Sequence, residues 1–204
     1  MKLSVVIPCF NVVDTIEAQL EALTKQQCSE AWEIIIADNG STDETLNVVK
    51  KYQHSLTNLR IVDASAIKGS AHARNVGASL AVSQNLAFCD ADDEVTPGWV
   101  AAMIEALSRH DFVAGNSDYS KLNEAWIVKC CGVREANGIK DYEYFPYAAG
   151  NNLGIKRSIH DRVGGFDPDC DGCEDWDMWL RLAAIGEFTV IPKYQVMYRR
   201  ASGS

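Results

Sequence analysis

The stretch Leu86-Ala87-Phe88-Cys89-Asp90-Ala91-Asp92-Asp93 carries three aspartates within four residues, directly after a short apolar run. The apolar residues predict a buried strand, so the carboxylates lie at its carboxyl end. In an α/β protein that edge of the sheet is where ligands bind. Carboxylates this close repel one another unless a cation or hydrogen-bond donors offset their charge. Oxygen ligands favour Mg²⁺ or Mn²⁺, so the stretch predicts a site for one of these ions. The alternative to such a site is a solvated acidic loop.

Strand-like and helix-like patterns alternate along the first 115 residues around this stretch. The alternation predicts an α/β fold with a mostly parallel, doubly wound central sheet and helices on both faces. We expect Ser41-Thr42-Asp43-Glu44 to form a capping box that opens a helix reaching about Tyr52. The predicted strands are residues 3–8, 32–37, 59–63 and 85–89, and the other predicted helices are residues 14–27, 70–82 and 96–109.

The alternation weakens beyond Phe112. We predict one more strong helix at residues 175–185. Short strands are predicted at residues 112–116, 126–132, 148–154, 188–191 and 195–199. The chain is therefore expected to form one domain, residues 1–204, with a Rossmann-like nucleotide-binding half (1–115) and a half for a second substrate (116–204).

Composition limits the class of protein. The chain has 204 residues, of which 47% are hydrophobic, and a formal net charge of −9. The acidic balance argues against non-specific nucleic-acid binding, which needs a basic face. No apolar run approaches the roughly 20 residues of a membrane span, and the start lacks a signal-peptide hydrophobic region. We expect a cytoplasmic protein, with peripheral attachment at the inner face of the membrane left open.

The seven cysteines are an odd number, and Cys9 and Cys89 fall inside predicted strands. We therefore expect reduced core thiols. Cys170 and Cys173 have the spacing of metal or redox ligands, so a zinc site completed by Cys130-Cys131 is the alternative.

Two other strand ends carry groups that chemistry can use. Pro8-Cys9-Phe10-Asn11 offers an aromatic ring and an amide to a flat base. Asp38, which precedes Asn39-Gly40, either accepts the imide N–H of uracil or caps the following helix. Gly69 opens another helix that carries Arg74, and backbone N–H groups there together with Arg74 could hold phosphate oxygens. Arg74 as an ordinary helix-surface charge is the alternative.

Taken together, these motifs resemble glycosyltransferase family 2, the inverting transferases of the GT-A fold. The resemblance runs from Leu3 to about Arg199 and rests on six motifs in the family's order. They are Val5-Val-Ile-Pro-x-Phe-Asn11, Asp38-Asn-Gly-Ser-Thr-Asp43, Gly69-x4-Arg-Asn-x-Gly77, Asp90-x-Asp-Asp93, Gly164-Gly-Phe-Asp167 and Glu174-Asp-Trp-Asp177.

The resemblance implies a metal-dependent transfer of sugar from a nucleotide-diphosphate sugar, expected here to be UDP-linked, to a carbohydrate, lipid-linked or other hydroxyl acceptor. It assigns the nucleotide pocket to Pro8, Phe10, Asn11 and Asp38. The donor sugar, the acceptor and the oligomeric state are not indicated.

For the reacting end, the resemblance implies that Asp90 contacts the ribose and that Asp92 binds the Mg²⁺ or Mn²⁺ bridging the diphosphate. Asp175 would be the base that takes the acceptor proton, with an N-terminal helix cap as its alternative role. A base on one side and a stabilised leaving group on the other are what direct displacement at an anomeric carbon requires. Trp176 and Trp179 share a helix face, either for core packing or for stacking on a sugar.

One position departs from the family. Many relatives have a histidine where this chain has Ala201, after Tyr198-Arg199-Arg200. Metal affinity is therefore in question, and Arg199 or Arg200 could supply positive charge instead. The competing functions are a sugar-phosphate nucleotidyltransferase, a carboxylate-pair glycosidase and a catalytically degenerate nucleotide-binding partner protein. The first normally has a glycine-rich loop after strand one, which residues 8–12 lack.

Overall fold

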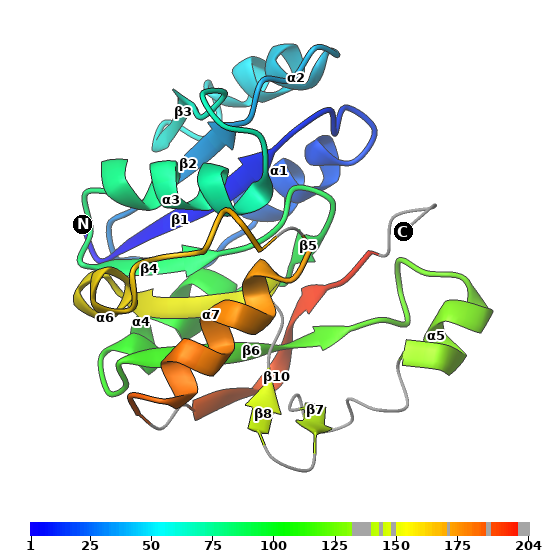
Figure 1. Ribbon diagram of the computed structural model, residues 1–204. Helices are drawn as coiled ribbons and strands as arrows, with labels where there is room; N and C mark the ends of the chain where they lie inside the picture. Colours follow the sequence, from blue (N-terminus) through cyan, green and yellow to red (C-terminus); the bar gives the residue numbers. More distant parts are fainter. Residues whose placement is uncertain (132–139, 143–144, 148–149, 171, 187–188, 200–204) are drawn as a thin grey trace.

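The computed structural model describes residues 1–131, 140–142, 145–147, 150–170, 172–186 and 189–199. An eight-stranded sheet in the order β3-β2-β1-β4-β9-β6-β10-β5 forms its centre (Figure 1). The strands are β1 (Leu3–Cys9), β2 (Trp32–Asp38), β3 (Leu59–Asp63), β4 (Asn85–Phe88), β5 (Glu94–Val95), β6 (Phe112–Asp118), β9 (Leu153–Lys156) and β10 (Thr189–Met197). A separate hairpin pairs β7 (Lys140–Tyr142) with β8 (Phe145–Tyr147).

The predicted mostly parallel sheet is confirmed. Strands β1 to β4 pair in parallel, as do β6 and β10. Two strands run the other way: β9 is antiparallel to both β4 and β6, and β5 is antiparallel to β10. The carboxyl ends of β1 to β4 consequently meet at one edge of the sheet, where the predicted nucleotide-binding motifs lie.

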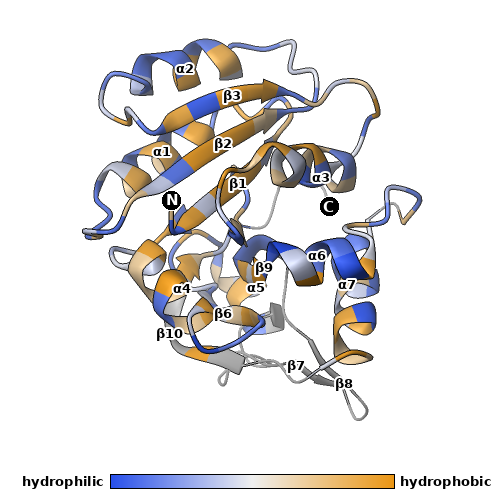
Figure 2. Cartoon of the chain, turned by 90° about the vertical axis from the view of Figure 1, so that its left-hand side faces the viewer, coloured by the Kyte–Doolittle hydropathy of each residue, from blue (hydrophilic) through white to orange (hydrophobic). Residues whose placement is uncertain are grey.

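Helices cover both faces of the sheet, as expected (Figure 2). One face packs against α1 (Ile16–Thr24), α2 (Thr45–Tyr52) and α4 (Trp99–Leu107). The other packs against α3 (Ser70–Leu80), α6 (Arg157–Val163) and α7 (Glu174–Ala183). Alternate residues of β1 point to opposite faces: Val5 and Ile7 belong to the first core and Val6 to the second.

Close approach of α3 to the sheet depends on one glycine. A Cβ on Gly77 would lie 2.4 Å from Val6 Cγ1, so only glycine lets the helix pack this tightly on β1. This places the start of α3, with Gly69 and Arg74, against the carboxyl end of β1. Trp179 is buried against Phe112 and Trp176 packs at the edge of the same core, which agrees with the packing role for this pair.

Several predicted elements were wrong. Residues 126–132 were expected to form a strand, but Ala125–Cys131 is helix α5, and residue 132 lies outside the described residues. The expected capping box is also incorrect. Helix α2 begins at Thr45, and the Thr45 amide donates to Asp43 Oδ1 at 3.0 Å. Strand β9 begins at Leu153 after the short 3-10 turn η2 (Gly150–Asn152), later than expected.

The two strands expected near the end of the chain form the single strand β10, whose pairing with β6 is irregular between Val190 and Val196. Within the described part of the chain, no helix has the length and apolar character needed to cross a membrane.

Candidate functional site

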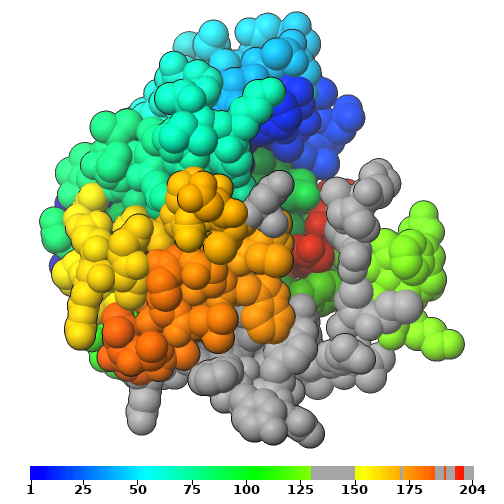
Figure 3. Space-filling view, viewed as in Figure 1, coloured from blue at the N-terminus to red at the C-terminus, as the bar shows by residue number. Residues whose placement is uncertain are grey.

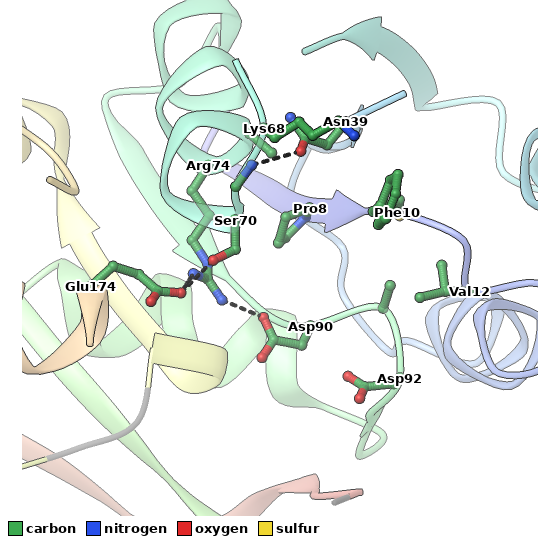
Figure 4. Close-up of a pocket in the computed structure, with 14 residues that line it drawn as sticks. Pro8, Phe10, Val12, Asn39, Lys68, Ser70, Arg74, Asp90, Asp92 and Glu174 are labelled. Carbon is green, nitrogen blue, oxygen red and sulfur yellow. Dashed lines mark hydrogen bonds and ion pairs between the residues drawn. The ribbon is translucent and has the colours of Figure 1, made fainter. Parts of the chain in front are cut away.

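A cavity of about 480 Å³ opens at the carboxyl ends of β1 and β4, beside the start of α3 (Figure 4). Its volume falls in the range of small-molecule sites. Most of the predicted site residues come together here. Those that line it are Pro8, Phe10, Gly69, Arg74, Asp90 and Asp92.

Three carboxylates meet on one side of the cavity. Ligand oxygens of Asp90, Asp92 and Asp93 lie within 4.8 Å of one another. Asp93 is buried and accepts hydrogen bonds from Asn151 Nδ2 at 2.5 Å and from the Arg199 amide at 2.7 Å. Burial and the neighbouring Asp90 raise the pKa of Asp93 well above its usual value. Asp93 therefore holds the acidic loop in place.

Asp92 differs from Asp93 because the charges of Arg199 and Arg74 offset its own charge only in part. Among the described residues, no other residue donates a hydrogen bond to the Asp92 carboxylate; Arg199 contacts its carbonyl oxygen instead, at 2.9 Å. Burial and the charge of Asp90 raise the pKa of Asp92 to about 6. A half-buried carboxylate that lacks a partner and faces a second carboxylate fits a hard divalent cation.

Arg74 is buried, so the alternative of an ordinary surface charge is wrong. Only 5% of the residue is exposed, and its guanidinium bridges two carboxylates. Nη2 donates to Asp90 at 2.7 Å and Nη1 to Glu174 at 2.9 Å. Nε has no hydrogen-bond partner in the described part of the chain. Arg74 thus joins α3, the acidic loop and the start of α7.

Two predicted nucleotide-pocket residues do not line the cavity. Asp38 is buried at the end of β2, where its carboxylate accepts from the amides of Gly40 and Ser41 at 3.2 Å. Asn11 has a φ of 51°, and its side-chain oxygen accepts from the Thr42 amide at 2.7 Å. In this structure both side chains fix the loops that flank the cavity, and Asp38 braces its own turn and caps no helix.

Asn39, which sequence analysis did not single out, lines the cavity next to Asp38. Its Nδ2 donates to the carbonyls of Ala64 and Ile67 at 2.6 and 2.8 Å, and its Oδ1 accepts from the Gly69 amide at 2.8 Å. The Asn39 side chain therefore fixes the loop that enters α3. Lys68, on the same loop, also lines the cavity and makes no ion pair within the described residues.

Asp175 lies on the first turn of α7 and does not itself line the cavity, whereas its neighbour Glu174 does. Asp175 Oδ1 accepts from the Trp176 amide at 2.8 Å, but the N-cap position of α7 is Cys173, so Asp175 is not the cap of this helix. Gly150 of η2 packs so closely that a Cβ there would lie 3.0 Å from Asp175 Cβ. The motif Gly164-Gly165-Phe166 is fixed to α3 by Asn75, which exchanges hydrogen bonds with the Phe166 backbone at 2.7 and 2.9 Å.

The cysteines behave as expected where they are described. Cys9 and Cys89 are free and buried, and burial raises the pKa of both thiols. Cys170 and Cys173 are free as well. The cluster that Cys170 joins contains Asp167 and Asp177, not Cys173, and Asp177 is already paired with Arg181. The thiols of Cys130 and Cys131, and the residues Arg200 and Ala201, lie outside the described part of the structure.

The amino-acid sequence matches the model of the glycosyl transferase family 2 over residues 4–170. The chain belongs to this family. It is 28% identical over 203 residues to the uncharacterized glycosyltransferase YwdF of Bacillus subtilis, covering 97% of this chain and 74% of that protein. It is also 32% identical over 127 residues to a PGL/p-HBAD biosynthesis glycosyltransferase of Mycobacterium bovis, covering 60% and 49% of the two chains. Family membership supports glycosyl transfer as the activity.

Comparison with solved structures shows that this chain has the GT-A fold. Staphylococcus aureus TarS in complex with UDP superposes with a TM-score of 0.75 at 20% identity, over 98% of this chain and 61% of TarS. The mannosyltransferase PcManGT from Pyrobaculum calidifontis, in complex with GDP-Man and Mn²⁺, gives a TM-score of 0.72 at 22% identity, over 94% and 54%. The family 2 chain described here thus spans little more than half of these neighbours.

Proposed function

We propose that this protein is a divalent-cation-dependent, inverting glycosyltransferase that takes a sugar from a nucleoside-diphosphate sugar, UDP-linked, to an acceptor hydroxyl. The observation that carries the proposal is the Asp92 carboxylate, which faces Asp90 inside the cavity, has a pKa of about 6 and accepts no hydrogen bond from another described residue. A diphosphate next to these carboxylates requires a cation between them. Solved relatives of the same fold bind UDP or, in another case, GDP-Man and Mn²⁺.

The residues divide into two groups with separate tasks. Asp92 would hold the Mg²⁺ or Mn²⁺ ion, and Asp90, oriented by Arg74 at 2.7 Å, would contact the ribose. A bound divalent cation would stabilise the negative charge of the diphosphate leaving group. Pro8, Phe10, Gly69 and the loop held by Asn39 would position the nucleotide, and Asp38 at the end of β2 lies next to that loop.

Asp175 is proposed as the base. Its carboxylate lies on the first turn of α7, one residue from Glu174, which lines the cavity. A carboxylate there can take the proton of an acceptor hydroxyl as the hydroxyl attacks the anomeric carbon. Direct attack on the side opposite to the leaving group inverts the configuration. The acceptor-binding role of residues 116–204 remains part of this proposal.

Thermal unfolding of the protein with UDP or GDP tests the donor site. With Mn²⁺ or Mg²⁺ present, we expect UDP to raise the midpoint, because a ligand at about 100 times its Kd adds roughly 2.7 kcal/mol to the stability. Excess chelator should remove most of the UDP effect. Equal stabilisation with and without the cation contradicts a metal-bridged site, and stabilisation by GDP alone contradicts the uridine assignment.

A further inference from the structure

A cluster of charged and polar side chains, centred on the buried Arg74, connects the two sides of the cavity. Glu174 Oε1 accepts a short hydrogen bond from Ser70 Oγ and a second one, at 2.9 Å, from Arg74 Nη1 (Figure 4). Ser70 and Arg74 lie on the first turns of α3, and Glu174 is the first residue of α7. The segment that leads into α7 lies directly against α3 on the molecular surface (Figure 3).

The electrostatics of Glu174 mark it as a fixed anion. Its side chain is 13% exposed and that of Arg74 is 6% exposed, so the ion pair is shielded from water. Burial alone would raise the pKa of Glu174, but the hydrogen bond from Ser70 and the charge of Arg74 outweigh burial and leave the pKa below its usual value. A carboxylate whose pKa is lowered is a weaker proton acceptor than an ordinary one.

Glu174 directly precedes Asp175 in the chain, so its contacts affect the position of Asp175. The Cβ of Asp175 packs on Gly150 of η2. The first turn of α7 is therefore fixed on one side by η2 and on the other by the contacts of Glu174 with α3. Arg74 extends those contacts to Asp90 at 2.7 Å, on the donor side of the cavity.

We propose that Glu174 is a positioning residue, which fixes the start of α7 to α3 and thereby sets the place of the Asp175 carboxylate relative to the donor. This inference rests on the proposed function, because it assumes that Asp175 is the base. Loss of the Glu174 contacts would displace Asp175 while leaving Asp92, Phe10 and the Asn39-held loop in place. A small displacement of a reacting group reduces turnover with little effect on donor binding.

The test compares Glu174→Gln and Ser70→Ala with Asp169→Asn. The control variant Asp169→Asn removes the charge of an exposed carboxylate in the loop that precedes α7, five residues before Glu174. We expect Glu174→Gln to lower kcat by about 10- to 100-fold with the donor Kd changed by less than about twofold. Ser70→Ala should lower kcat in the same direction but less, and Asp169→Asn should behave like the unmodified protein.

The double variant Ser70→Ala/Glu174→Gln should lose little more activity than Glu174→Gln alone, because Ser70 acts only through its hydrogen bond to residue 174. Unchanged kcat in Glu174→Gln overturns the proposal. A parallel loss of donor binding also overturns it, since Glu174 would then belong to the donor site, and a loss as large as that in Asp175→Asn would point to Glu174 as the base.

Amide hydrogen exchange gives a reading that does not depend on turnover. Glu174→Gln should speed exchange in the first turn of α7, at residues 175–178, by about tenfold or more, and leave the buried helix α4 unchanged. Unchanged exchange in α7 overturns the positioning role. Absence of sugar transfer by the unmodified protein, by contrast, counts against the proposed function and leaves the exchange measurement to decide whether Glu174 fixes α7.

Discussion

At the scale of single residues, the lining of the cavity depends on which of two adjacent residues, Asp38 or Asn39, faces it. Asp38 and Asn39 are adjacent at the end of β2, and the family resemblance placed Asp38, with Pro8, Phe10 and Asn11, in the nucleotide pocket. In the structure Asn39 lines the cavity and Asp38 braces the turn. Side chains alternate along a strand, but the phase at its last residue depends on the turn that follows, which the sequence pattern does not determine.

Buried contacts were equally hard to predict from single residues. Asp90, Asp92, Gly69 and Arg74 were identified because their motifs follow predicted strands. The ion pair of Arg74 with Glu174 joins residues 100 positions apart, and no local spacing indicates it.

Lys68 should contribute to donor binding through its charge. Asn39 holds the backbone on both sides of Lys68, so the ammonium group is presented at the cavity from a fixed loop. We expect Lys68→Ala to weaken UDP binding by about fivefold, ~1 kcal/mol, and to reduce its sensitivity to salt. Titration calorimetry at two salt concentrations measures this, with Lys51→Ala on α2 as the control. Equal Kd values for Lys68→Ala and the control would show that the ammonium group does not contact the donor.

At the scale of elements, the sequence predicted the parallel half well, because continuous apolar runs and helix patterns alternate there. Strand β5 was missed and β9 was misplaced because both pair antiparallel with distant segments, which local periodicity cannot indicate. The Trp126-Ile127-Val128 run has strand-like composition, yet the backbone carbonyl of Glu124 accepts from the Ile127 and Val128 amides at the start of helix α5.

Glu33 shows how buried charge connects elements at the edge opposite to the cavity. Its carboxylate accepts from Ser4 Oγ of β1 at 2.5 Å, Arg60 Nε of β3 at 2.9 Å and the Val82 amide after α3 at 2.6 Å. Burial by itself would raise the pKa of Glu33, but the hydrogen bonds from Ser4 and Val82 and the contact with Arg60 keep it lowered.

We expect Glu33→Gln to cost about 2 kcal/mol of unfolding free energy at neutral pH, since hydrogen bonds to a charged group are lost. Because the folded-state pKa is lowered, the ionised group stabilises the protein above the unfolded pKa and less as pH falls. The difference between Glu33→Gln and the unmodified protein should therefore shrink below about pH 4. Urea unfolding at pH 7 and at about pH 3 checks this, with exposed Glu30→Gln as the control. A penalty that stays constant with pH would mean that the charge contributes nothing.

At the scale of the whole molecule, both halves of the chain build the site. The first half supplies the cavity floor from β1, β4 and α3. The second supplies Glu174 and Asp175, and Arg199 contacts the backbone of Asp92 and the carboxylate of Asp93 from beyond β10. This arrangement implies that the site has a donor side and a base side, which mutations can disrupt separately. The division of the chain into halves at residue 115 stays a prediction.

The most direct test of the proposed mechanism compares Asp92→Asn with Asp175→Asn in a sugar-transfer assay paired with UDP titrations. Asp92→Asn should lose cation-dependent UDP binding and transfer together. Asp175→Asn should bind UDP and cation normally and lose transfer by roughly 10²- to 10⁴-fold, the usual contribution of a positioned base. Near-normal transfer by Asp175→Asn, or cation-dependent UDP binding by Asp92→Asn, would contradict the account.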